Sequence, residues 1–203
     1  PTDNGAYLFD NSVRNEALRD HDEIAPAVLQ AFGAKEFAAG LIRWALKPDI
    51  LAPEIRASCK FVADRINSVR RTRAASPKAA TRRAAGTPEK FTEDRYVGDS
   101  LVFIPQLVAE GRDYVTPGLL PAKSLVLAPH FQASAASLAP FAVIASRLHL
   151  VWIATVCGKL KTDFRYSNTL GWNTFPVPLL TEQNKADLTR CAAALPVVVT
   201  GRD

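Results

Sequence analysis

Signatures of nucleotide and metal binding are missing from this sequence. No two of its ten glycines stand in a GxG pattern and no GxxxxGK[ST] loop occurs, which excludes the common glycine-rich loops for dinucleotides, S-adenosylmethionine and nucleoside triphosphates. The three histidines are isolated from one another and from cysteines or acidic pairs at metal-ligand spacing. We therefore expect neither a metal ion nor a cofactor in this chain.

Nucleophile motifs and targeting segments are missing as well. There is no GxSxG, and no cysteine has a histidine partner in its sequence context, so no catalytic residue is expected. The three cysteines lack CxxC spacing, which excludes a disulfide framework or zinc ribbon and is typical of a reducing, cytoplasmic setting. Residues 1–23 are too charged for a signal peptide. With no methionine and a proline at position 1, we expect a domain of a longer protein.

Positive charge is concentrated in one segment. Residues 60–83 hold eight Lys/Arg and one acid, a net charge of +7 in a chain of net charge +5. Such a segment on a nearly neutral body indicates a polyanionic partner, and the alternative is a solvated helix face. The candidates for contact with phosphates are Arg70, Arg71, Arg73, Lys78, Arg82 and Arg83.

Short apolar runs separated by glycine and proline predict a mixed α+β fold, with a short mixed β-sheet packed against helices. Strands are expected within residues 42–46, 99–108, 112–116 and 124–128, and the first 32 residues are expected to be irregular or partly helical.

Four helical segments are also predicted. After Pro53, apolar residues recur at helical spacing as far as Val69, so the opposite face of that helix carries the arginines. Pro77 breaks the helix, and residues 78–85 restart it to give a pair of basic helices. Residues 137–156 are apolar almost throughout and predict one buried helix, because a proline, an arginine and a histidine interrupt them. Thr181 is expected to cap a last helix that ends near Ala194.

Between these last two helices lies a basic and aromatic hairpin followed by a polar loop. Phe164 and Tyr166 share one strand face, which is expected to pack, while Asp163 and Arg165 share the free face. Trp172–Phe175 is expected to be a second short extended piece. Tyr166, Trp172 and Phe175 are interpreted as anchors of the loop rather than as stacking platforms for a flipped base.

The polar side chains of this region suit contact with nucleic acid. Lys159 and Lys161 are candidates for phosphate contacts or, like Arg165, for pairing with guanine; asparagine pairs with adenine, and serine and threonine tolerate several bases. The alternative for serine and asparagine is a structural role in a tight turn. The candidates for base recognition are Arg165, Ser167, Asn168, Thr169 and Asn173.

Three motifs in register resemble the target-recognition domain of MmeI-like (type IIL) restriction-modification DNA methyltransferases. The segment SRLHLVWIATVCGKLKTDFRYSNTLGWNTFPVP is similar to that family's helix, GRLKSDYRYS-like turn and YNNFPWP-like exit. Upstream, GAKEFAAGLIRWAL, RTRAASPKAATRRAAGTPEKF and LVFIPQLVAEGRDYVTPGLL resemble other family segments, and the likeness covers about residues 33–178.

The resemblance implies a non-catalytic module that recognises double-stranded DNA and follows an adenine-specific methyltransferase domain in the same parent chain. S-adenosylmethionine is then expected in that methyltransferase domain, and no membrane is expected as a partner. The implied organisation is a lead-in over residues 1–32, the recognition domain over 33–178, and a C-terminal helix and tail over 179–203. Two alternatives stay open: a protein-interaction domain that docks on a partner enzyme, and a hydrolase with a dispersed active site.

Overall fold

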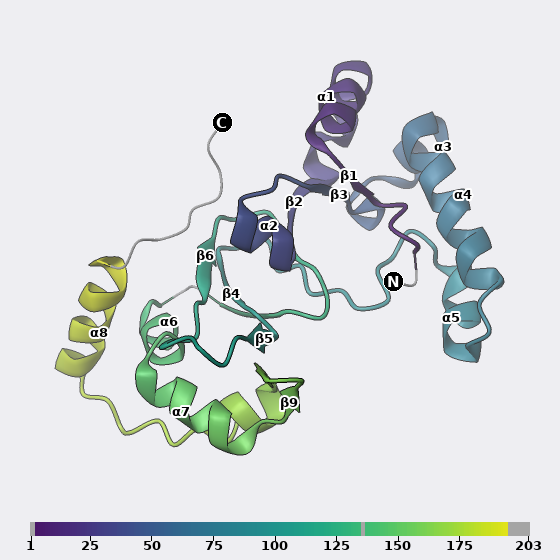
Figure 1. Cartoon of the computed structure of the whole chain (residues 1–203). Helices are drawn as coiled ribbons and strands as arrows, with labels where there is room; N and C mark the ends of the chain where they lie inside the picture. Colours follow the sequence, from purple (N-terminus) through teal and green to yellow (C-terminus); the bar gives the residue numbers. More distant parts are fainter. Residues whose placement is uncertain (1–2, 135–136, 195–203) are drawn as a thin grey trace. The chain divides into compact units, whose positions relative to one another are not determined.

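The computed structural model describes residues 3–134 and 137–194, which form two compact units (Figure 1). The first unit combines the described residues up to Phe32 with Leu41–Tyr96, and the second combines Gly33–Gly40 with the described residues from Val97 onward. Each unit has its own cluster of buried apolar side chains. In the described part of the chain, no helix combines the length and apolar character that crossing a membrane requires.

A small antiparallel sheet and the N-terminal helix build one side of the first unit. Strand β3 lies between β1 and β2, with Ala45 opposite both Leu8 and Leu29. Helix α1 begins because the Asp10 carboxylate accepts a hydrogen bond from the Val13 N–H at 3.0 Å. The elements are β1 (Leu8–Phe9), α1 (Asn11–Asp20), the 3₁₀ helix η1 (Asp22–Ala27), β2 (Val28–Phe32), β3 (Trp44–Leu46) and the 3₁₀ helix η2 (Pro48–Ile50).

The first 32 residues are thus more ordered than the sequence predicts. Tyr7, Phe9, Ala17 and Ile24 are buried in the same cluster as the apolar face of the basic helices. Strand β1 was missed because it is only two residues long, too short to show a period.

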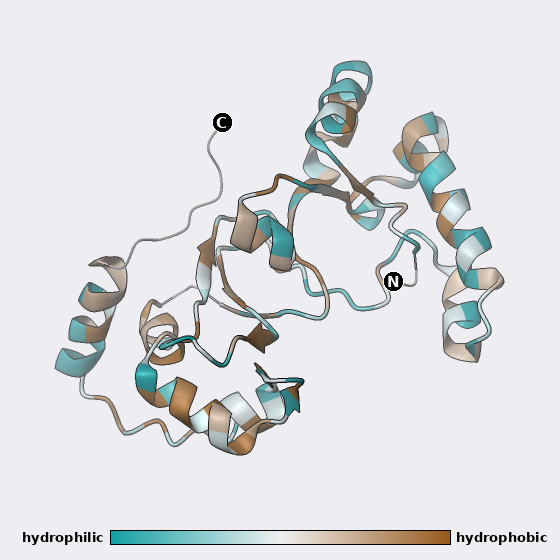
Figure 2. Ribbon diagram, viewed as in Figure 1, coloured by the Kyte–Doolittle hydropathy of each residue, from teal (hydrophilic) through white to brown (hydrophobic). Residues whose placement is uncertain are grey.

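The basic helices are present, but the first predicted helix is interrupted at Cys59. Pro53 opens helix α3 (Pro53–Ser58), and after Cys59 helix α4 (Lys60–Ala74) buries Val62, Ile66 and Val69 at helical spacing. Figure 2 shows hydrophilic and hydrophobic residues alternating along α4, as an amphipathic surface helix requires. After the interruption at Pro77, α5 (Ala79–Arg83) and the 3₁₀ helix η3 (Ala84–Gly86) follow.

The second unit contains two three-stranded antiparallel sheets instead of one mixed sheet. Strand β4 (Leu101–Ile104) lies between β6 (Gly118–Leu120) and β8 (Phe131–Ser134), and β10 (Asp163–Arg165) lies between β5 (Leu107–Val108) and β9 (Lys159–Leu160). The expected strand at 112–116 is wrong, since these residues form a loop; β7 (Ser124–Val126) agrees with its prediction. The α+β class is confirmed.

Two helical parts of this unit differ from the sequence prediction. Residues 34–39 form helix α2 (Ala34–Ala39), which ends where Gly40 adopts a φ of 64°. The predicted single helix over 137–156 is two helices, α6 (Ala139–Ile144) and α7 (Arg147–Val156). The break has a local cause: Ser146 is extended, and its hydroxyl accepts a hydrogen bond from the His149 N–H at 3.1 Å, starting α7 afresh.

The last helix agrees with its prediction. Helix α8 (Glu182–Ala194) follows Thr181, whose hydroxyl accepts a hydrogen bond from the Asn184 N–H at 3.1 Å. The predicted tail continues over residues 195–203, which lie outside the described residues.

Candidate nucleic-acid interface

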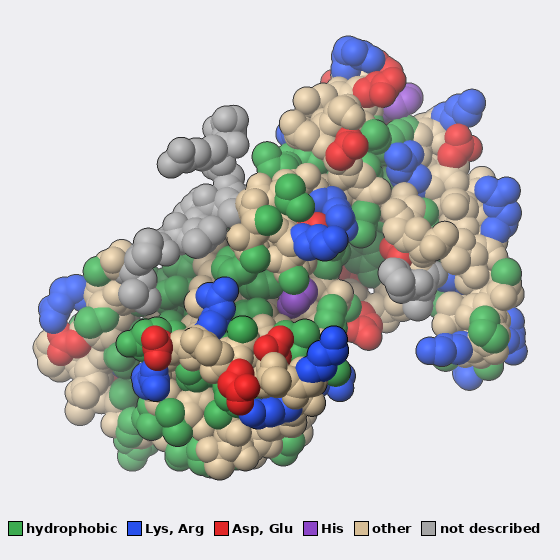
Figure 3. All heavy atoms as spheres, viewed as in Figure 1, with side chains coloured by type: hydrophobic (Ala, Val, Ile, Leu, Met, Phe, Trp, Pro, Cys, Tyr) green, Lys and Arg blue, Asp and Glu red, His purple; other side chains and the backbone are tan. Residues whose placement is uncertain are grey.

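Exposed cations line the basic helices of the first unit. Arg70 and Arg71 lie near the C-terminal end of α4. Lys78 immediately precedes α5, and Arg82 and Arg83 are its last two residues. All five side chains are exposed. Lys and Arg side chains gather at this end of the unit, around α5 (Figure 3). The geometry is that expected for contacts with a phosphate backbone, which needs accessible cations rather than a defined pocket.

Two of these arginines are partly held by their own surroundings. Arg82 donates to the backbone carbonyls of Ser76 and Pro77 at 2.9 and 2.7 Å, which closes the turn between α4 and α5. Arg70 donates to the Asn67 side chain at 3.0 Å. Such local bonds reduce the entropy lost when a long side chain is fixed on a ligand.

Arg73 is a correction to the sequence analysis. Its side chain is 1% exposed, and its two terminal nitrogens donate to the carbonyls of Ala84, Thr87 and Lys90 at 2.9–3.1 Å. A guanidinium committed in this way cannot also reach a phosphate. Arg73 instead fastens the segment after α5 to α4. Charge density in the sequence did not distinguish it from its neighbours, although its spacing of four from Val69 places it on the buried face.

Arg56 is a cation that the sequence analysis missed. It lines an open hollow of about 490 Å³ between α3 and α4, together with Asn67, Arg70 and Glu89. It lies on α3, one element before the basic run, and only the packing of the two helices brings it beside Arg70.

The predicted hairpin is present in the second unit. Asp163 pairs with Leu160 and Phe164 with Lys159, and Lys161 occupies the turn with a φ of 57°. Phe164 is buried while Arg165, Lys159 and Lys161 are exposed, as the alternation predicts. Lys159 forms an ion pair with Glu110 at 2.7 Å, so its charge is partly neutralised within the unit. Lys161 and Arg165 are the more available cations.

The loop that follows is helical, and the extended piece expected over Trp172–Phe175 is wrong, since Trp172 ends the helix and residues 173–174 form a turn. Residues Asn168–Trp172 form a π-helix, η4, and the Ser167 hydroxyl accepts a hydrogen bond from the Leu170 N–H at 3.3 Å. Ser167 is therefore the residue whose side chain stabilises this turn. Asn168, Thr169 and Asn173 are exposed, and their side chains make no hydrogen bond with the described part of the chain. They are therefore accessible to a ligand.

A buried aromatic cluster lies beneath this loop. His149 of α7 is fully buried, with Nε2 3.1 Å from the Tyr166 hydroxyl and its ring edge-on to Phe175 at 4.7 Å. Trp172 packs against the same imidazole at 6.0 Å. Burial lowers the pKa of His149 from 6.5 to about 4, so the ring is neutral at physiological pH. The three aromatic residues thus act as anchors, as the sequence analysis proposed.

A glycine lets the loop approach α7 closely. A Cβ on Gly171 would lie 3.2 Å from both Cys157 Sγ and Ile153 Cγ2, which is tighter than ordinary packing. The backbone of η4 therefore rests directly on the end of α7, and the polar residues on its outer side are held by a rigid support.

Comparison with known proteins relates this arrangement to DNA modification. The profile of the MmeI target recognition domain matches residues 1–179. The chain belongs to the MmeI target recognition domain family. The predicted resemblance, which was limited to residues 33–178, is confirmed and extends to the N-terminal elements of the first unit.

Two relatives show how far this MmeI-type domain extends within larger proteins. It is 29% identical over 188 residues to DNA methyltransferase A of Bacillus subtilis (strain 168), a match that covers 93% of the chain and 21% of that protein. It is also similar to the type IIL restriction-modification enzyme MmeI, solved in complex with DNA, with a TM-score of 0.88 and 26% identity over 96% of the chain and 26% of that enzyme. The chain spans about a fifth to a quarter of these relatives.

Proposed function

We propose that this domain recognises a specific double-stranded DNA sequence for an adenine-specific, S-adenosylmethionine-dependent methyltransferase of a restriction-modification system, and performs no chemistry itself. The single observation that carries the proposal is the loop after Tyr166. There the side chains of Asn168, Thr169 and Asn173 are exposed and make no hydrogen bond with the described residues, and a buried cluster lies beneath the loop. The likeness to an enzyme solved with DNA supports the same assignment.

The two units would divide the work of recognition. Arg70, Arg71, Lys78, Arg82 and Arg83 supply affinity through phosphates, together with Lys159 and Lys161 of the second unit. Arg165, Asn168, Thr169 and Asn173 contact base edges, since arginine pairs with guanine and asparagine with adenine. The Ser167 hydroxyl accepts a hydrogen bond from the Leu170 N–H within the loop, so only its own proton and its other lone pair are available for a base contact.

The hydrolase alternative needs a nucleophile beside a base in a pocket. The hollow between α3 and α4 is lined instead by two arginines, an asparagine and a glutamate among apolar residues, and offers no such pair. The protein-interaction alternative is distinguished from DNA recognition by the experiment below.

The test is the salt dependence of DNA binding, measured by fluorescence anisotropy with a random-sequence duplex. If the seven cations assigned to phosphates each make one contact, the slope of log K against log salt is about −6.3. Arg71→Ala should reduce its magnitude by about 0.9, while Arg19→Ala, which removes an exposed arginine from α1, should leave it unchanged. A flat salt dependence would contradict the proposal.

Base recognition is tested separately by selecting bound sequences from a random duplex library. Asn168→Ala and Thr169→Ala should relax the preference at one or two positions and leave the salt slope as it was, because they remove base contacts only. If they weaken binding to all sequences equally, the loop does not recognise bases.

A further inference from the structure

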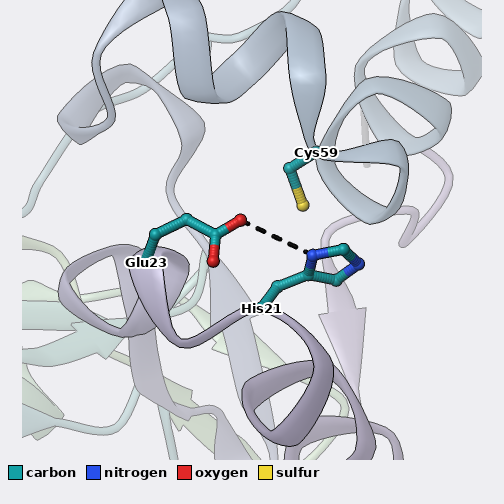
Figure 4. A group of neighbouring side chains, drawn as sticks. All are labelled: His21, Glu23 and Cys59. Carbon is teal, nitrogen blue, oxygen red and sulfur yellow. Dashed lines mark ion pairs between the residues drawn. The ribbon is translucent and has the colours of Figure 1, made fainter.

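Three side chains with metal-ligating atoms meet in the first unit, away from the cations assigned to DNA. They are His21, at the junction of α1 and η1; Glu23, in the first turn of η1; and Cys59, between α3 and α4. Their ligand atoms all lie within 4.8 Å of one another, and Figure 4 shows the three side chains pointing toward a common point. The sequence analysis missed this group because Cys59 is remote from the other two in the chain.

The geometry of the group fits a small tetrahedral ion. Zinc bonds of about 2.0–2.3 Å to nitrogen, oxygen and sulfur place neighbouring ligand atoms roughly 3.3–3.8 Å apart. His21 Nδ1 and Glu23 Oε1 are already 3.5 Å apart. The other separations, which reach up to 4.8 Å, must shorten to this range for three bonds to form.

The donor set selects the metal. One imidazole nitrogen, one carboxylate oxygen and one thiolate sulfur suit zinc, whereas magnesium and calcium prefer oxygen ligands alone. When the ion binds, the Cys59 thiol gives up its proton to solvent, and the sulfur becomes a ligand.

The three residues differ in how much of each is exposed to solvent. Cys59 is 2% exposed, while the side chains of His21 and Glu23 are 32% and 41% exposed. An ion can therefore enter from the solvent side and come to rest on the buried sulfur, with its fourth position left to water.

The backbone already holds the ligands in place. The His21 N–H donates to the Ala17 carbonyl at 2.9 Å, and the Cys59 N–H donates to the Ile55 carbonyl at 3.0 Å. The Cys59 carbonyl in turn accepts from the first turn of α4. Ligands fixed at helix ends lose little entropy on coordination.

We infer that His21, Glu23 and Cys59 bind one zinc ion, which ties the α1–η1 junction to the start of the basic helix α4. The site is independent of the DNA-binding function proposed above. The alternative is a plain ion pair between His21 and Glu23 beside an uninvolved thiol.

Cobalt(II) tests the inference because a thiolate bound to cobalt gives a charge-transfer band in the near ultraviolet. The intact 203-residue chain, reduced and freed of metal with a chelator, should develop this band with a stoichiometry of one on cobalt addition, and zinc should abolish it. Cys59→Ser should remove the band, and Cys191→Ser, at an exposed cysteine, should keep it. Absence of the band in the native chain, or its survival in Cys59→Ser, would overturn the inference.

Thermal unfolding supplies a second measurement that does not depend on the buried cysteine. Zinc at 100 times its dissociation constant should raise the Tm by roughly 5–10 °C, because it binds the folded state alone. His21→Ala changes a partly exposed residue and should fold normally but lose this shift. Glu16→Gln, an exposed acid on α1, is the matched control and should retain it. An equal shift in His21→Ala would show that the ion binds elsewhere.

Discussion

At the scale of single residues, Arg71 and Arg73 show how neighbours in one basic run take opposite roles. Arg71 is exposed at the end of α4, whereas Arg73 is buried and bonded to three carbonyls of the following segment. The two are separated by two positions, about 200° around a helix, so only one can face the core.

We expect Arg73→Ala to lower the free energy of unfolding by about 2–4 kcal/mol, since it leaves three backbone acceptors without their donor. Arg71→Ala should change it by less than about 0.5 kcal/mol, as an exposed substitution. Urea unfolding followed by circular dichroism measures both. Equal stability of the two variants would mean that the Arg73 bonds contribute nothing.

His149 predicts a dependence of stability on pH. Its pKa is lowered from 6.5 to about 4 in the fold because the ring is buried, and its Nδ1 has no hydrogen-bond partner among the residues the structure describes. Between these values the unfolded chain binds a proton that the folded chain does not, so stability falls as pH falls through this window. The contribution lost from pH 7 to pH 5 is about 2 kcal/mol.

Comparison with His149→Gln isolates this contribution, because glutamine can still bond to Tyr166 but does not titrate. The difference in unfolding free energy between pH 7 and pH 5 should be smaller in the variant by about 2 kcal/mol. If both proteins lose stability equally, His149 is not the group responsible.

At the scale of elements, the hydrophobic pattern predicted those parts whose order is local. Pro53, Pro77 and Thr181 mark ends of helices that the structure contains, and the hairpin follows from the alternation at Phe164 and Arg165. The division of α6 from α7 was not predictable from hydropathy, because both halves are apolar and the break depends on a single hydroxyl cap. The π-helix was missed because its form is set by contact of Gly171 with α7.

This contact leads to a prediction for the loop. Gly171→Ala should push η4 away from α7, cost about 1–3 kcal/mol of stability through overpacking, and weaken discrimination between DNA sequences. Gly111→Ala is the matched control, since its added methyl group would meet nothing within 4 Å. The measurements are thermal unfolding and selection from the duplex library. If Gly171→Ala is destabilised but keeps the same sequence preference, the position of the loop does not determine specificity.

At the scale of the whole molecule, the class of function followed from the sequence better than the individual contacts did. Charge density located the basic helices, and the order of the motifs identified the family. Which arginine faces solvent, and which polar residue of the loop is consumed by the turn, depended on packing that no linear pattern shows. The group of His21, Glu23 and Cys59 was likewise not predictable, because only folding brings the α1–η1 junction and the α3–α4 junction together.

Because the two units have separate cores, substitutions in them should act independently on binding. We expect the losses of DNA affinity from Arg71→Ala and Asn168→Ala to add within about 0.5 kcal/mol in the double variant. Anisotropy titrations of the four proteins on one selected duplex complete the cycle. A coupling above about 1 kcal/mol would show that the phosphate and base contacts depend on each other.

The division of labour in the loop bears on how such a domain changes its target over evolutionary time. The imidazole and aromatic rings beneath the loop are buried, whereas the side chains of Asn168, Thr169 and Asn173 are exposed. Mutations at such positions usually shift stability by no more than about 0.5 kcal/mol. On the base-reading role proposed above, a lineage would acquire a new recognition sequence by replacing these few side chains while the buried cluster stays the same.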